Sequence, residues 1–191
     1  MKTLFERYLR LAKEKNQLIS IRTDNENADK FSVGYVLGIN DDVINIKAVN
    51  PKGQPDGVYT VQTEDIYGLD IDDKYLKRLQ LKLDKQKEIF ADTSVPSIFM
   101  DGEVNIRKII EKAKEQKQLI HVNFYRDIGL YGFINEVLDD EFVIEVYDEH
   151  GEYDGISIFI IDDIRNINWD DEDIRVVDKL RVLKNTGPNN V

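Results

Sequence analysis

The chain has 191 residues, of which 41% are hydrophobic and 33% charged, and its formal net charge is −11. This composition is typical of a soluble globular protein, and the lack of cysteine excludes disulfides, thiol nucleophiles and thiolate metal sites. The N-terminus carries charges too early for a signal peptide, and no apolar run is long enough to cross a bilayer. We therefore expect a cytoplasmic protein with no membrane partner.

The sequence contains an internal duplication. Residues 34–73 and 132–171 align without a gap, and eleven of the forty pairs are identical. Most identical residues are turn formers, and the rest are regularly placed isoleucines, so the duplication keeps a backbone shape and not a reactive group. We predict four segments: a first repeat over 1–90, a linker over 91–102, a second repeat over 103–184 and a disordered tail over 185–191.

Each repeat is expected to begin with an amphipathic helix, because apolar residues recur at helical spacing in residues 3–16 and again in 104–117. Short strands follow, where apolar and polar residues alternate between turn signals. They are expected at 18–22, 31–39, 43–49, 58–63 and 66–71 in the first repeat, and at 119–124, 131–138, 142–147, 156–161 and 164–169 in the second.

A run of acids closes each set of strands, at residues 70–73 and 170–173. Acids suit the start of a helix, where free backbone N–H groups point outward. We therefore predict that the following segments, 74–90 and 174–184, are helical. The alternation of Leu79, Leu81 and Leu83 also fits a strand, so both readings stay open.

Five consecutive antiparallel strands are expected to curl into a small barrel, because an open sheet would leave its edges unpaired. The predicted fold class is mainly β with α. It consists of two tandem repeats, each an N-terminal helix plus a strongly bent five-stranded antiparallel barrel, joined by a helical linker.

This arrangement resembles the Sm-like (LSm) family, whose first motif has a glycine in strand two, aliphatics two and five residues later, and then an acid. The matching residues are Gly34, Val36, Ile39 and Asp41, and in the second repeat Gly132, Ile134, Val137 and Asp139. The resemblance implies a bent barrel, ring assembly through strands four and five, and RNA binding by two loops. SH3-like, Tudor-like and WYL barrels fit much of the same pattern.

The chain departs from this family where RNA is bound. The family's second motif places Arg-Gly before the last strand, but residues 62–64 read Gln-Thr-Glu and 160–162 read Ile-Ile-Asp. The pocket asparagine of the first motif corresponds to Asn45, whereas the second repeat has Val143. An Sm-like fold therefore does not by itself predict RNA binding here.

No catalytic constellation is evident. His121 and His150 are the only histidines, neither is duplicated, and neither shows Ser-His-Asp spacing. The paired acids do not fit the register of a calcium loop, and no glycine-rich phosphate loop is present. We therefore expect no enzyme activity, no catalytic residue, no metal and no cofactor.

The fourth strand of the second repeat is the best interface candidate. Residues 156–161 are apolar on both faces, whereas residues 58–63 alternate. A strand that is apolar on both faces is usually covered on both, here by the other repeat or by another chain. The candidate interface residues are Ile156, Ile158, Phe159, Ile160 and Ile161.

The excess of acidic side chains in both repeats favours protein binding over RNA binding. Residues 18–73 carry four basic and eleven acidic side chains, and residues 118–171 carry two and fourteen. An acidic body attracts basic proteins and repels phosphate, so we predict a non-catalytic interaction or assembly module that binds itself or another protein. The alternative is an RNA-binding protein that uses Lys74, Lys77, Arg78, Lys82 and Asn45.

Overall fold

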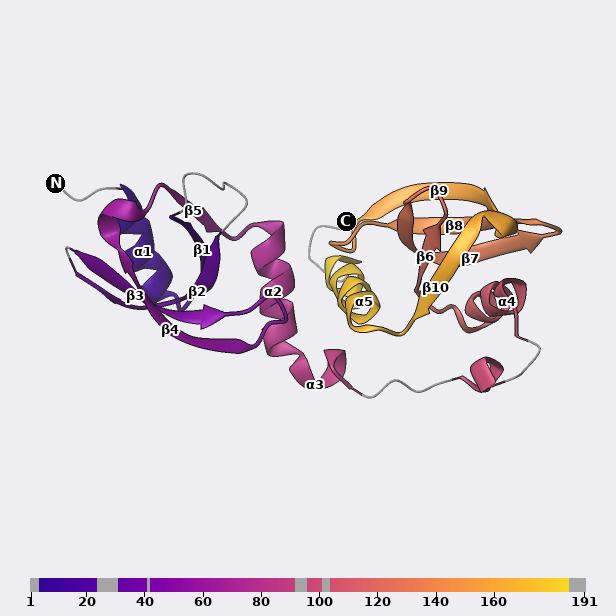
Figure 1. The fold of residues 1–191 in the computed structure, drawn as a ribbon, viewed down its shortest axis with the longest axis horizontal. Coiled ribbons are helices and arrows are strands. Elements are labelled where there is room, and N and C mark those ends of the chain that lie inside the picture. The colour runs from indigo at the N-terminus through magenta and orange to yellow at the C-terminus, as the bar shows by residue number, and fades with distance from the viewer. Residues whose placement is uncertain (1–3, 24–30, 41, 92–95, 101–103, 186–191) are drawn as a thin grey trace. The chain divides into compact units, whose positions relative to one another are not determined.

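The computed structural model describes residues 4–23, 31–40, 42–91, 96–100 and 104–185 (Figure 1). The chain divides into two compact units, Met1–Gln86 and Lys87–Val191. Apart from Asn185, the predicted disordered tail lies outside the described residues. Within the described ranges, no helix is long and apolar enough to span a membrane.

The first unit is a five-stranded antiparallel sheet with a helix before it and a helix after it. Its strands lie in the order β4-β3-β2-β1-β5. Its elements are α1 (Leu4–Glu14), β1 (Leu18–Arg22), β2 (Ser32–Ile39), β3 (Val43–Val49), β4 (Pro55–Gln62), the short 3-10 helix η1 (Thr63–Asp65), β5 (Gly68–Ile71) and α2 (Lys74–Asp84).

The second unit repeats this arrangement, which confirms the predicted duplication at the level of topology. Its strands lie in the order β10-β6-β7-β8-β9. The short helix α3 (Gln86–Ile89) spans the boundary between the units. The elements that follow are η2 (Ser97–Met100), α4 (Ile106–Gln116), β6 (Ile120–Phe124), β7 (Gly129–Leu138), β8 (Glu141–Tyr147), β9 (Tyr153–Ile160), η3 (Ile161–Asp163), β10 (Ile164–Trp169) and α5 (Glu172–Asn185).

The prediction of closed barrels is wrong. In the described residues β4 pairs only with β3 and β5 only with β1, so the first sheet is open, and β9 and β10 are the corresponding edges of the second. The open sheet still buries an apolar core. Leu9 and Ala12 of α1 are buried against the apolar face of the first sheet, so a helix covers the surface that a closed barrel would enclose.

Helices of its own unit pack on part of both faces of each sheet. Leading helices cover one face, and their buried side chains are Leu9 and Ala12 in α1 and Ile110 and Ala113 in α4. Trailing helices cover the other face through Leu76 and Leu79 in α2 and through Ile174 and Val177 in α5. Each unit therefore has two separate small cores, one between the sheet and the leading helix and one between the sheet and the trailing helix.

The acidic runs begin the trailing helices, as predicted. The side chain of Asp73 accepts a hydrogen bond of 2.7 Å from the backbone N–H of Leu76, and Asp171 accepts one of 2.9 Å from that of Ile174. These N-caps satisfy backbone donors that the first helical turn leaves free. Residues 74–84 are therefore helical, and the strand reading of the leucines is wrong.

Candidate protein-interaction surface

The candidate interface strand, β9, forms one edge of the second sheet. It pairs along one side with β8, in a register that places Ile156 opposite Glu145, Ile158 opposite Val143 and Ile160 opposite Glu141. Among the strands that the structure describes, none pairs with β9 on its other side. An edge of this kind presents backbone N–H and C=O groups to which another strand can bind.

The five candidate residues divide between the two faces of β9. Phe159 points into the core, where its ring lies 4.3 Å from that of Phe124, and Ile161 is buried at the start of η3. Ile156, Ile158 and Ile160 point the other way and are 60%, 66% and 49% exposed. The inner face is therefore covered by the strand's own unit, and the outer face is a row of three exposed isoleucines.

The corresponding strand of the first unit lacks this row. At the positions of Ile156, Ile158 and Ile160, β4 has Val58, Thr60 and Gln62, of which only Val58 is apolar. Single exposed apolar residues are ordinary, whereas adjacent ones mark interaction surfaces. The apolar edge is therefore a property of the second unit and not of the repeated fold.

Acidic side chains border the isoleucine row. Residues directly opposite on antiparallel strands share a face, so Glu141 and Glu145 lie beside Ile160 and Ile156. The hydroxyl of Tyr147 donates a hydrogen bond to Glu145, and burial, together with this bond, raises the pKa of Tyr147 to about 12. Tyr147 therefore stays protonated and holds the Glu145 carboxylate in place.

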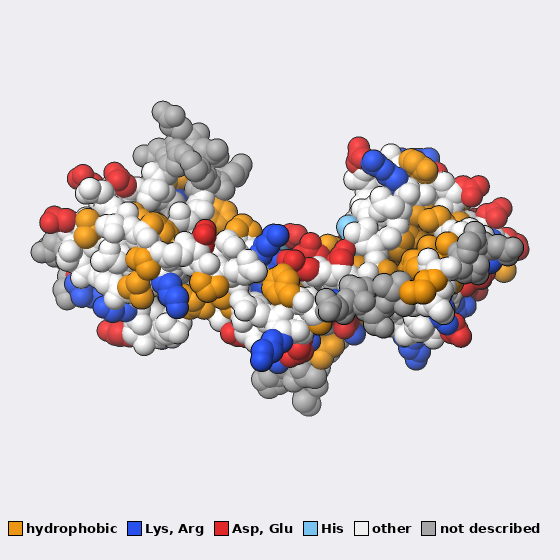
Figure 2. Space-filling view, turned by 60° about the horizontal axis from the view of Figure 1, so that its bottom comes forward, with side chains coloured by type: hydrophobic (Ala, Val, Ile, Leu, Met, Phe, Trp, Pro, Cys, Tyr) orange, Lys and Arg blue, Asp and Glu red, His pale blue; other side chains and the backbone are white. Residues whose placement is uncertain are grey.

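Four of the five RNA candidates lie on one helix, α2, and Asn45 lies on β3. Lys82 is only 6% exposed, and Lys77 forms an ion pair of 3.4 Å with Asp72. Asn45 lies on β3, where its side-chain oxygen accepts a hydrogen bond of 2.8 Å from Thr60, whereas Lys74, Lys77, Arg78 and Lys82 all belong to α2. On the face shown in Figure 2, basic side chains form small separate groups among acidic ones.

One histidine lies on β6 and the other in the turn before β9. The ring of His121 stacks on that of Tyr131, with centroids 4.2 Å apart, and burial lowers its pKa. His150 lies in the turn before β9, with its Nε2 3.5 Å from Glu149. Within the described ranges, no three His, Asp or Glu side chains are placed to hold a metal ion.

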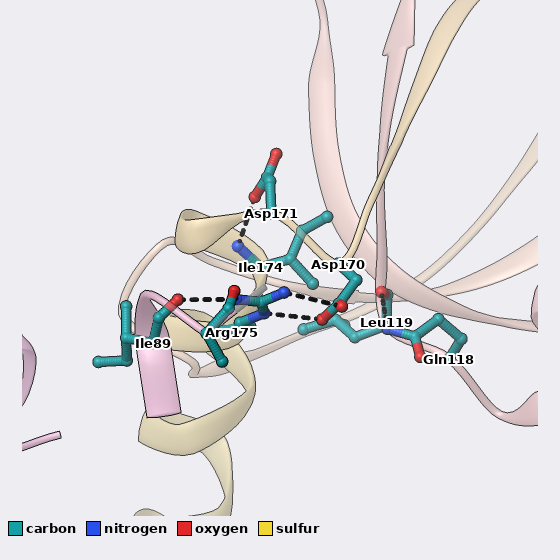
Figure 3. Close-up of polar contacts among 8 residues, drawn as sticks. Ile89, Gln118, Leu119, Asp170, Asp171, Ile174 and Arg175 are labelled. Carbon is teal, nitrogen blue, oxygen red and sulfur yellow. Dashed lines mark hydrogen bonds and ion pairs between the residues drawn. The ribbon is translucent and has the colours of Figure 1, made fainter. Parts of the chain in front are cut away.

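Sequence reasoning missed one polar cluster, which is centred on Arg175 of α5 (Figure 3). Arg175 donates two hydrogen bonds of 2.9 Å to the carboxylate of Asp170 and further bonds to the backbone carbonyls of Ile89 and Ala91. Lys179, one turn later, pairs with Glu88. The cluster therefore holds the end of α3 and the residues after it against α5.

The signal that pointed to this cluster was weak. Its partners are main-chain carbonyls, which carry no residue identity, and they lie far from Arg175 in the sequence. Only the pairing of Arg175 with Asp170, repeated in the first unit as Lys77 with Asp72, is visible in the aligned repeats.

Comparison of the chain with protein-family models, with curated proteins and with solved structures found no match.

Proposed function

We propose that the protein is a non-catalytic interaction module that binds a protein partner along the free edge of β9. The observation that carries this proposal is the row formed by Ile156, Ile158 and Ile160 on an edge strand whose inner face is already buried. The partner contributes an extended segment that continues the sheet and covers the isoleucines.

An Sm-like framework fits this mode of binding. Each unit has a leading helix and five strands, with the fourth and fifth strands at opposite edges of the sheet. The Sm-like resemblance implies assembly through those two edges. The open sheet supports this part of the proposal, because it leaves both edges without a strand partner of their own unit.

The chemistry of the surface favours a partner strand that is apolar in its centre and basic at its ends. Covering an isoleucine side chain completely contributes roughly 1.5–3 kcal/mol before the entropic costs of association are subtracted. Glu141 and Glu145 at the ends of the row attract Lys or Arg of the partner. The partner is a second copy of the chain or another protein.

Size-exclusion chromatography with light scattering tests the proposal in its self-association form. We expect the mass of the wild type to rise with concentration and Ile156→Lys to remain monomeric. Val58→Lys is the matched control, because Val58 occupies the aligned position on β4 and is 63% exposed against 60% for Ile156. Val58→Lys should associate like the wild type.

If the wild type stays monomeric, the proposal is tested with other proteins as partners. Immobilised wild type, Ile156→Lys and Val58→Lys are then compared for the proteins that each retains from a lysate. The proposal requires a protein that the wild type and Val58→Lys retain and Ile156→Lys does not. If the three chains retain the same proteins, the edge of β9 is not an interaction surface.

A further inference from the structure

The two units differ at the groove between the leading helix and the last strand of the sheet. In the second unit, η2 lies next to this region and its Phe99 packs edge-to-face on Trp169 of β10, with ring centroids 5.4 Å apart. The turn that carries Phe99 is closed by a hydrogen bond of 3.0 Å from its N–H to the carbonyl of Pro96. A short turn therefore places an aromatic ring against the end of the edge strand.

The first unit has an apolar pocket at the corresponding place. Its volume is about 310 Å³, and its lining residues are Leu4, Phe5, Tyr8, Leu69 and Ile71. The equivalence is set by strand register: Ile71 pairs with Ile19 of β1 as Trp169 pairs with Ile120 of β6. The pocket thus lies where the second unit has the contact between Phe99 and Trp169.

The walls of this pocket also correspond between the units. Phe5, Leu69 and Ile71 pack against the core of the first unit, and Ile106, Ile167 and Trp169 pack against that of the second at the aligned positions. The rim is different. Leu4 is 71% exposed and Tyr8 is 45% exposed, while Asn105 stands in the position of Leu4 as the N-cap of α4.

We propose that this pocket binds an aromatic side chain that a turn of another polypeptide presents, as the Pro96–Phe99 turn does in the second unit. The occupant is a peptide segment because, in the second unit, an aromatic residue on a short turn packs on Trp169, which aligns with Ile71 of the pocket wall. Among the described residues, the lining contains no charged side chain and hence no cation for a phosphate, which further favours an aromatic residue. This surface belongs to the first unit and is independent of β9.

Nuclear magnetic resonance of the full chain with a synthetic peptide of residues 94–104 tests the proposal. We expect saturable shifts of the backbone amides of Leu69 and Ile71. A peptide with Phe99→Ala should bind about tenfold more weakly or not at all. In the protein, Tyr8→Glu should weaken binding to the same extent, because it places a charge at the apolar rim, and circular dichroism checks that α1 is kept.

Two further variants make the outcome unambiguous. Leu37→Glu is the control, because Leu37 is an exposed leucine of the same unit, 47% exposed, that does not line the pocket. Ile156→Lys should bind the peptide like the wild type, which separates this result from any result at β9. Absence of saturable shifts, or equal affinity of Tyr8→Glu and the wild type, overturns the proposal.

A second copy of the chain is the other occupant to test. Light scattering of the wild type and Tyr8→Glu without peptide decides this point. A dimer that forms in the wild type and is lost in Tyr8→Glu would assign the pocket to a second copy and overturn the choice of a separate partner. Equal masses for the two chains, together with peptide binding that Tyr8→Glu weakens, support the proposal.

Discussion

Arg175 and Asp170 form a two-bond ion pair that the first unit has only in reduced form. The guanidinium of Arg175 donates to both carboxylate oxygens of Asp170, each at 2.9 Å, and the two side chains are 13% and 28% exposed. At the aligned positions, Lys77 and Asp72 are 3.4 Å apart and 58% and 67% exposed. The aligned pair is therefore a part-buried anchor in the second unit and an exposed ion pair in the first.

Replacing Arg175 should destabilise the second unit. Arg175→Met leaves the Asp170 carboxylate and the carbonyls of Ile89 and Ala91 without their donor, and we expect a loss of about 2–4 kcal/mol in the free energy of unfolding. Guanidinium denaturation followed by the fluorescence of Trp169, the single tryptophan, reports on this unit. Lys77→Met is the matched control and should change stability by less than about 0.5 kcal/mol. Equal effects of the two changes would contradict the anchoring role.

The sequence was informative wherever local chemistry sets the structure. Asp73 and Asp171 could be identified as helix starts, because an N-cap needs only a short acceptor side chain beside the first turn. The strands followed from alternation, and the duplication followed from identical turn residues. Each of these signals lies within a few residues of the feature that it predicts.

The errors concern contacts between distant segments. Barrel closure depends on pairing between the edge strands β4 and β5, and the alternation of residues within each strand does not report on that pairing. The candidate interface strand was singled out because Ile156, Ile158 and Ile160 break the alternation seen in its repeat partner. Alternation places Phe159 and Ile161 on the other face of the strand, but only the packing of Phe159 on Phe124 shows which face is buried.

Single-stranded RNA should not bind through α2. Lys82 is buried and Lys77 is paired with Asp72, so α2 offers fewer cations to a phosphate backbone than its sequence indicates. We expect no saturable mobility shift with single-stranded RNA at low salt. A shift that weakens with salt and is lost when Lys74 and Arg78 are changed to Gln would instead establish the RNA-binding alternative.

The stability of the second unit should depend on pH through His121. Burial lowers the pKa of His121 below its usual value of 6.5, and the charges of Asp171 and Asp173 offset part of this effect. The unfolded chain therefore takes up this proton at a higher pH than the folded chain does. The free energy of unfolding must then fall as the pH decreases through about 6.5.

His121→Asn removes this titration and serves as the comparison. Its free energy of unfolding should fall less than that of the wild type between about pH 7.5 and pH 5.5. The lost stacking on Tyr131 lowers the stability of the variant at every pH and does not alter the slope. Parallel curves for the two proteins would show that His121 titrates alike in the folded and unfolded chains.

The paired glycines of β2 and β7 should not accept a side chain without loss of stability. A Cβ at Gly34 would lie 2.3 Å from the backbone oxygen of Lys47, and one at Gly132 would lie 2.4 Å from that of Glu145. Both oxygens belong to the adjacent strand, whose position is fixed by its hydrogen-bonded pairing. We expect Gly34→Ala and Gly132→Ala each to lower the free energy of unfolding by roughly 2–3 kcal/mol.

The control for these glycines lies on the same strand. A Cβ at Gly38 would meet only the side-chain nitrogen of Asn45, at 3.5 Å, so Gly38→Ala should change stability by less than about 0.5 kcal/mol. The unfolding of Gly132→Ala is measured by the fluorescence of Trp169. The unfolding of Gly34→Ala and Gly38→Ala is measured by circular dichroism. If Gly34→Ala were as stable as Gly38→Ala, the close approach of β3 would not be the reason for a glycine at position 34.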